Sequence, residues 1–106
     1  MNIQELLELT LKNNASDLHI IKGVRPTIRI HGQLEEITSQ APVDEERAQE
    51  LVFGVISEEE KERFFKQKEL DFSYALSSGA RFRVNIYFSR GVPAASFRAI
   101  PSSIPT

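Results

Sequence analysis

Apolar residues recur at helical spacing in three segments of the chain. The first segment, at residues 3–13, reads IQELLELTLKN and places most of its apolar residues on one helical face. The other two begin with helix-start signals, because Asp44 can cap the helix after it and Ser57 precedes Glu60 at the capping-box spacing. The pattern therefore predicts three helices, at residues 3–13, within residues 41–57 after Asp44, and at residues 58–69.

Other segments alternate apolar and polar residues, which is the spacing of strands with one buried face. Short strands are predicted in DLHIIKG and in TIRIHGQLEEI, with a tight reversal at His31 and Gly32. The last third contains LDFSYAL, RFRVNIYF and AASFRAI, separated by the turns SSG and SRGVP. Because successive strands joined by short turns favour an antiparallel meander, we expect an α+β fold with about six strands in a mostly antiparallel sheet and three helices.

Length and composition indicate one compact domain. The chain has 106 residues, of which 41% are hydrophobic and 26% are charged, and it contains no cysteine. Neither a disulfide framework nor a thiolate metal site is therefore expected. No apolar run approaches the ~20 residues that a membrane span needs, and the N-terminus lacks the basic start of a secretory signal. We expect a cytoplasmic protein without direct membrane insertion.

The formal net charge of −2 conceals an uneven distribution of charge. Eleven acidic and five basic residues lie between Glu35 and Glu69, whereas no acid follows Asp71. The charged residues beyond that point are all arginines: Arg81, Arg83, Arg90 and Arg98. Arg81 and Arg83 have the same strand parity, so they are predicted to project from one face of their strand.

Arginine forks grip phosphate or carboxylate groups, including a phosphate bound to a neighbouring subunit. The alternative for each arginine is an ion pair with the acidic helices of the same chain. Nucleic-acid binding is disfavoured, because the domain is net acidic and Tyr87 is the sole aromatic residue on the outer face of that strand.

The stretch ASDLH contains Ser16, Asp17 and His19 within four positions, which are residue types common in catalytic and metal-binding sites. Asp17 and His19 share one strand face about 6–7 Å apart, whereas Ser16 has the opposite parity, which does not make a triad. A metal site would need three or more ligands, and the only other histidine is His31. We interpret the stretch as a helix-to-strand junction in which Ser16 or Asp17 satisfies backbone groups. A small hydrolase using Asp17 and His19 remains an alternative; no catalytic residue or metal ligand is assigned.

The glycines do not form a phosphate-binding loop. None of the five belongs to a G-x-x-x-x-G-K-[ST] or G-x-G-x-x-G pattern, so the chain has no Walker A motif of its own, and no Walker B motif is assigned in it either. No cofactor is expected to bind to this chain alone.

Five motifs occur in a fixed order along nearly the whole chain: ASDLHI, G-x-x-P followed by IRIHGQL, ELDFSYAL, ARFRVNIYFSRG and FRAIPSSIPT. Together they resemble the N-terminal domain of the PilT-like retraction ATPases of type IV pili, in the type II/IV secretion ATPase superfamily. The short N-terminus favours the retraction branch, because extension ATPases are expected to carry an extra domain.

The resemblance implies a PAS-like domain over residues 1–100, followed at residues 101–106 by the start of a linker to a RecA-like ATPase domain. That further domain would carry the phosphate loop, the Mg²⁺-binding acids and the catalytic glutamate. The chain itself is therefore expected not to be an enzyme, whereas its full-length parent would bind ATP and Mg²⁺ and hydrolyse the ATP.

The resemblance also implies partners. In the family, the N-terminal domain of one subunit packs on the ATPase domain of its neighbour within a homohexamer, which acts on the inner-membrane platform protein of the pilus. Arginines of the N-terminal domain can reach the neighbour's nucleotide as arginine fingers do. This role falls to Arg83 and Arg98, with Arg81 third.

The function implied is a regulatory and assembly domain of a cytoplasmic motor, peripheral to the inner membrane, that retracts pili in twitching motility. The alternative is a stand-alone PAS-type ligand-sensing or protein-interaction module, for which we would expect a sizeable apolar pocket inside the sheet.

Overall fold

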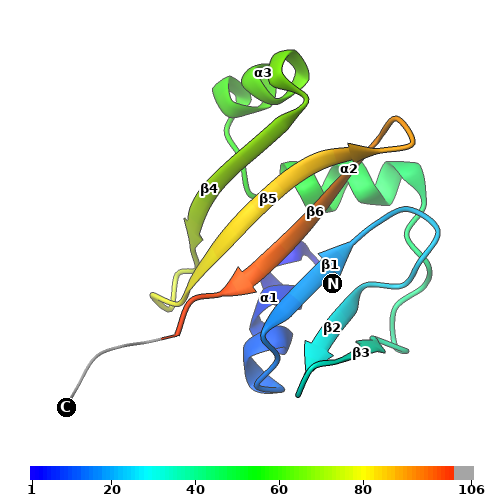
Figure 1. Ribbon diagram of the computed structural model, residues 1–106, viewed down its shortest axis with the longest axis vertical. Helices are drawn as coiled ribbons and strands as arrows, with labels where there is room; N and C mark the ends of the chain where they lie inside the picture. The colour runs from blue at the N-terminus through cyan, green and yellow to red at the C-terminus, as the bar shows by residue number, and fades with distance from the viewer. Residues whose placement is uncertain (102–106) are drawn as a thin grey trace.

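The fold is built on one six-stranded antiparallel sheet (Figure 1). The computed structural model describes residues 1–101. Across the sheet the strands are ordered β3-β2-β1-β6-β5-β4, and every neighbouring pair is antiparallel. In chain order they are β1 (Asp17–Ile20), β2 (Thr27–Ile30), β3 (Gln33–Glu36), β4 (Glu69–Ala75), β5 (Arg81–Ser89) and β6 (Val92–Ala99).

Two three-stranded meanders meet at the centre of this sheet. The first consists of β1, β2 and β3, and the second consists of β4, β5 and β6. They join where β1 pairs with β6, with Asp17 opposite Arg98 and Leu18 opposite Phe97. Residues from the two ends of the chain are therefore direct neighbours in the middle of the sheet.

Two helices cover one face of the sheet. α1 (Ile3–Lys12) and α2 (Glu45–Phe53) lie behind the strands in Figure 1, and no described helix lies over the near face. Between helices and sheet is a core of buried apolar side chains, which burial removes from water. Its largest fully buried members include Leu6, Leu7, Leu18, Leu51, Phe64, Phe82, Ile86 and Phe97.

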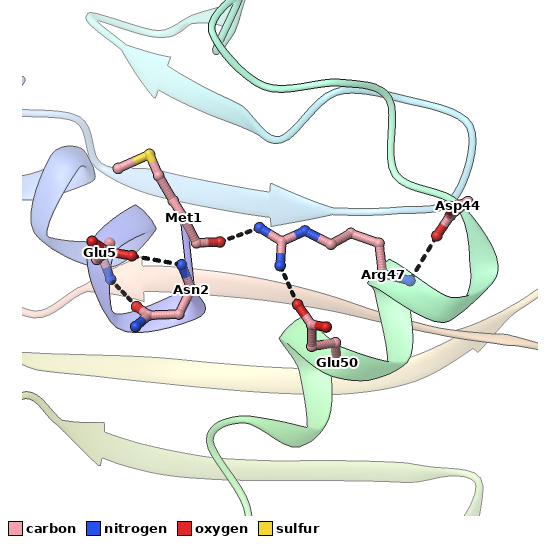
Figure 2. A network of polar contacts seen from close by, with 6 residues as sticks. All are labelled: Met1, Asn2, Glu5, Asp44, Arg47 and Glu50. Carbon is pink, nitrogen blue, oxygen red and sulfur yellow. Dashed lines mark hydrogen bonds and ion pairs between the residues drawn. The ribbon is translucent and has the colours of Figure 1, made fainter.

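The starts of α1 and α2 are capped and tied to each other, as Figure 2 shows. Asn2 and Glu5 form a capping box, in which each side chain accepts a hydrogen bond from the backbone N–H of the other. Arg47, in the first turn of α2, donates to the backbone carbonyl of Met1 and to the carboxylate of Glu50. The N-terminus of the chain is thereby held against α2.

The third helix, α3 (Glu58–Gln67), lies at one end of the sheet beside the start of β4 (Figure 1). It begins at the predicted capping box of Ser57 and Glu60. Its buried Phe64 stacks on Phe88 of β5, with the ring centroids 4.4 Å apart. The expected α+β fold, with six strands and three helices, is confirmed.

One turn is tighter than the sequence predicted. The predicted turn SRGVP is a two-residue reversal at Arg90 and Gly91, whose φ angles of 54° and 80° place both residues in the left-handed region. A turn of that kind matches the twist of the flanking strands, so Val92 already pairs with Ser89 and β6 starts earlier than predicted. The predicted reversal at His31 and Gly32 is confirmed, with φ angles of 49° and 80°.

The regular structure ends at Ala99, one residue before the predicted boundary of the domain. Of the predicted linker, residues 102–106 lie outside the described residues. Within the described part of the chain, every helix is too short or too polar to span a membrane.

Candidate functional site

The uncovered face of the sheet carries charged side chains in a row across four neighbouring strands. Strand pairing places Arg29 of β2 opposite Asp17 of β1, Asp17 opposite Arg98 of β6, and Arg98 opposite Arg83 of β5. Side chains at directly paired positions project from the same face of a sheet and lie close together. We call this set the arginine row: Arg29, Asp17, Arg98 and Arg83.

Asp17 is the buried member of the arginine row, with a side chain that is 10% exposed. One carboxylate oxygen lies 3.5 Å from Nε of Arg29, and the other lies 3.6 Å from Nε of Arg98. Nε2 of His19 lies 3.8 Å from the oxygen that faces Arg29. The two arginine separations are those of ion pairs rather than of hydrogen bonds. A buried carboxylate is costly unless it is paired with opposite charge, and the two arginines supply that charge.

Arg83 and Arg98 are both highly exposed, with 70% and 74% of their side chains accessible. Nη2 of Arg83 donates to Asp71 of β4 at 3.1 Å, an exposed pair near the edge of the sheet. Since Arg83 and Arg98 occupy directly paired positions, two like charges lie side by side. Asp71 and Asp17 offset part of this repulsion, and an anion bound between the two guanidinium groups would offset it further.

A shallow hollow of about 220 Å³ opens among these side chains. His19 is one of the lining residues, and its Nε2 is buried and has no hydrogen-bond partner among residues 1–101. Asn85 donates to Glu69 at 3.1 Å on the β4 side. The hollow is lined by Asp17, His19, Asp71, Arg83, Asn85 and Arg98, together with Ser96 and Phe97. Its basic donors suit an anion with several oxygens, such as a phosphate group.

The three arginines singled out from the sequence are not equally placed. The structure brings Arg83 and Arg98 together, whereas Arg81 lies two residues along β5, opposite Ala75. Arg81 makes no ion pair within the described part of the chain. The alternative of pairing with the acidic helices is wrong for Arg83 and Arg98, because their partners are Asp71 and Asp17 in the strands.

The junction interpretation of ASDLH holds for one of its residues. The backbone N–H of Ser16 donates to the carbonyl of Arg29, and the carbonyl of Ser16 accepts from the N–H of Ala99, both at 2.9 Å. The Ser16 hydroxyl faces the Arg29 carbonyl at 3.5 Å and is not paired with His19. The carboxylate of Asp17 does not satisfy backbone groups, as the junction interpretation allowed, but pairs with Arg29 and Arg98. Within residues 1–101, no group of three His, Cys, Asp or Glu side chains is arranged to hold a metal ion.

Sequence reasoning missed Asp17 and Arg29 as members of this site. The parity of Asp17 and His19 was visible in the sequence, and so was the hairpin that carries Arg29. The pairing of β1 with β6, which brings Asp17 to Arg98, joins distant segments and leaves no local signal.

No protein-family model matches the chain, but curated relatives match it over its whole length. It is 35% identical over 106 residues to the type IV pilus retraction ATPase PilT of Pseudomonas aeruginosa, and 31% identical to the type IV pilus ATPase PilU of that organism. The chain covers 30% of the first and 28% of the second. It therefore spans less than a third of the length of these relatives.

Solved structures give the same result. The crystal structure of the pilus retraction motor PilT with bound ADP matches 99% of this chain with a TM-score of 0.91 and 30% identity, and the match covers 31% of that protein. The ATPase DotB of Legionella pneumophila matches 97% of this chain over 30% of its own, with a TM-score of 0.80. At 22% identity, the second likeness concerns the fold alone. These comparisons confirm the resemblance that the sequence motifs carry.

Proposed function

We propose that this chain, a homologue of the N-terminal domain of PilT-like secretion ATPases, is the regulatory and assembly domain of a hexameric motor that retracts type IV pili. The names of its relatives support this function, since they include a retraction ATPase, a twitching motility protein of Neisseria gonorrhoeae and a retraction motor with bound ADP. The chain spans about 30% of the first of these relatives. ATP and Mg²⁺ would accordingly bind to an ATPase domain outside it, and the chain alone hydrolyses no ATP.

The observation that supports a role in nucleotide chemistry is the placement of Arg83 beside Arg98 on the uncovered face. Two exposed guanidinium groups at paired positions offer several donors to one anion, and phosphate charge would offset their mutual repulsion. In the hexamer, this face packs on the ATPase domain of the neighbouring subunit. Arg83 and Arg98 then donate to the phosphates of the ATP bound there, where arginine stabilises the charge of the transition state. Arg81 extends the same face along β5.

The proposed setting is the cytoplasmic side of the inner membrane. There the motor is peripheral and acts through the platform protein of the pilus. The arginine row couples the nucleotide state of one subunit to the position of the next, since a bound phosphate ties this domain to its neighbour and a released phosphate frees it.

Mixed hexamers test whether the arginines act on the neighbouring subunit. One partner is the full-length protein with Arg98→Ala, and the other is the full-length protein with the phosphate-loop lysine of its ATPase domain replaced. Each variant alone is expected to hydrolyse ATP far more slowly than the wild type. When the two are mixed and reassembled, activity above that of either variant is expected, because intact ATPase domains then meet intact arginines on their neighbours.

Activity of the mixed hexamers shows whether the arginine acts on the nucleotide of its own subunit or on that of the neighbouring subunit. If the arginine served the nucleotide of its own subunit, no mixed hexamer would contain a complete site and activity would stay at the sum of the separate variants. The same experiment with Arg83→Ala assigns the second arginine. Wild-type hydrolysis by intact hexamers of both arginine variants would contradict the proposed role of the arginine row.

A further inference from the structure

Asp17 occupies the centre of the sheet, between two arginines. β1 lies between β2 and β6, and the residues opposite Asp17 on these strands are Arg29 and Arg98. Its position is fixed by ladders on both sides, and its short side chain is nine-tenths buried. The carboxylate is therefore a fixed, buried negative charge between two arginines, whereas Asp71 and Glu69 of the same face are exposed on β4.

The two oxygens of Asp17 serve different arginines. Oδ2 faces Nε of Arg29, and Oδ1 faces Nε of Arg98. Arg29 is also held elsewhere, because its Nη1 donates to the carbonyl of Gly32 in its own hairpin at 2.9 Å. Arg29 is therefore bound to its own hairpin through a terminal nitrogen. Arg98 is instead 74% exposed and directed outward from the sheet.

The atoms used in these contacts decide what each arginine can still bind. Asp17 approaches Arg98 on its Nε, and the terminal nitrogens of Arg98 make no hydrogen bond with any residue in the range 1–101. Arg83 differs, because one of its terminal nitrogens already donates to Asp71. Since a guanidinium group is planar and has five N–H donors, an anion near Nε leaves terminal donors for a second anion.

We infer that Asp17 is the positioning residue for Arg98, holding its guanidinium group by the Nε side so that the terminal nitrogens face a phosphate. This inference rests on the proposed function of the arginine row. Without the carboxylate, Arg98 would lie between Arg29 and Arg83 with like charge on either side, and its rotamers would spread away from the productive one. Asp17 acts through Arg98 and does not itself touch the nucleotide.

A double-mutant cycle in the full-length hexameric protein tests this role. The variants are Asp17→Asn, Arg98→Ala and the combination of both. Asp17→Asn is expected to lower kcat for ATP hydrolysis by about 10- to 100-fold at nearly unchanged KM, because a misplaced catalytic group costs rate of this order. In the Arg98→Ala background, Asp17→Asn is expected to have no further effect, since the residue on which it acts is absent.

Two further variants separate positioning from general effects. Glu36→Gln removes the same charge from the same face of the sheet but touches Arg25, which belongs neither to the arginine row nor to the lining of the hollow, and it should leave kcat unchanged. Asp17→Glu keeps the charge and should retain more activity than Asp17→Asn. Thermal unfolding and hexamer assembly are measured for every variant, so that lost activity is compared only between folded, assembled proteins.

The outcomes distinguish this inference from the function on which it rests. Wild-type hydrolysis by assembled Arg98→Ala protein would overturn the arginine assignment and this inference with it. A slow Arg98→Ala protein combined with a fully active Asp17→Asn protein would overturn the positioning role alone. Independent, multiplicative losses in the double variant would also overturn it, because Asp17 would then act by some route other than Arg98.

Discussion

The two faces of the sheet carry alternate residues of the same strands, but the side chains on each face interact in different ways. On the covered face, Leu18, Phe97 and Val84 are paired across β1, β6 and β5, and all three are fully buried. On the open face, the residues preceding or following them in sequence form part of the arginine row: Asp17, Arg98 and Arg83. One strand position thus separates a hydrophobic interior from a charged surface.

This difference shows which part of the domain holds the fold and which part is available for function. Burial of apolar area on the covered face stabilises the domain in any salt. On the open face, the pair of Arg83 and Asp71 at 3.1 Å joins two exposed groups, and such pairs contribute little to stability and weaken with added salt. The buried carboxylate of Asp17 pairs at 3.5 and 3.6 Å with two arginines that reach the solvent. Substitutions on the open face can therefore change binding while the fold persists.

The largest effect is expected from Phe97→Ala on the covered face. This substitution removes a fully buried aromatic side chain at the centre of the sheet and should lower the free energy of unfolding by about 3–5 kcal/mol. Urea denaturation followed by far-ultraviolet circular dichroism measures the loss. A decrease below about 1 kcal/mol would mean that the core at β6 can close around the vacancy, contrary to the tight packing of protein interiors.

A smaller effect is expected from Asp17→Ala on the open face. The carboxylate is buried, but Arg98 is mostly exposed and Arg29 partly so, and both can be hydrated when the carboxylate is gone. The loss should therefore be about 1–2 kcal/mol, below the value for a pair whose remaining charge stays buried. The same denaturation experiment measures it. Equal or higher stability than the wild type would show that desolvation of the carboxylate outweighs its ion pairs.

The covered face could be predicted from the sequence because it depends on local rules. The alternation in RFRVNIYF predicts that Phe82, Val84, Ile86 and Phe88 point inward; the first three are buried and Phe88 is half-buried. The caps at Asp44 and Ser57 were predicted in the same way, since each needs only a few neighbouring residues. Periodicity of this kind is set by backbone geometry and holds in any antiparallel sheet.

The open face could be predicted only in part. Strand parity placed Arg81 and Arg83 on one face, but the arginine partners depend on which strands are neighbours. The acidic helices were the alternative partners for these arginines, but α2 lies behind the sheet and α3 lies at its end (Figure 1). The register of β1 on β6 puts Asp17 beside Arg98, and a non-local pairing of this kind cannot be read from periodicity.

The edge pair on the open face should matter less than the central one. Asp71→Asn removes the partner of Arg83, and both side chains of that pair are about half exposed or more. Exposed pairs contribute about 0.2–1 kcal/mol, so the loss should lie in that range and shrink as sodium chloride is added. Parallel denaturation curves for Asp71→Asn and Asp17→Ala at low and high salt compare the two pairs. A larger loss for Asp71→Asn would reverse the proposed difference between the edge and the centre.

The smallest effect is expected where an apolar residue lies on the open face. Leu34 of β3 pairs with Arg29 and is 56% exposed, whereas Leu18 of β1 is fully buried on the other face. The same substitution to alanine should lower the free energy of unfolding by about 2–5 kcal/mol at Leu18 and change it by less than about 0.5 kcal/mol at Leu34. Both variants lose the same atoms, so the contrast between their denaturation midpoints isolates burial from residue type. A loss above about 1 kcal/mol at Leu34 would mean that the open face is also packed at β3. The contrast between a buried apolar face and an exposed charged face would then not hold at that edge of the sheet.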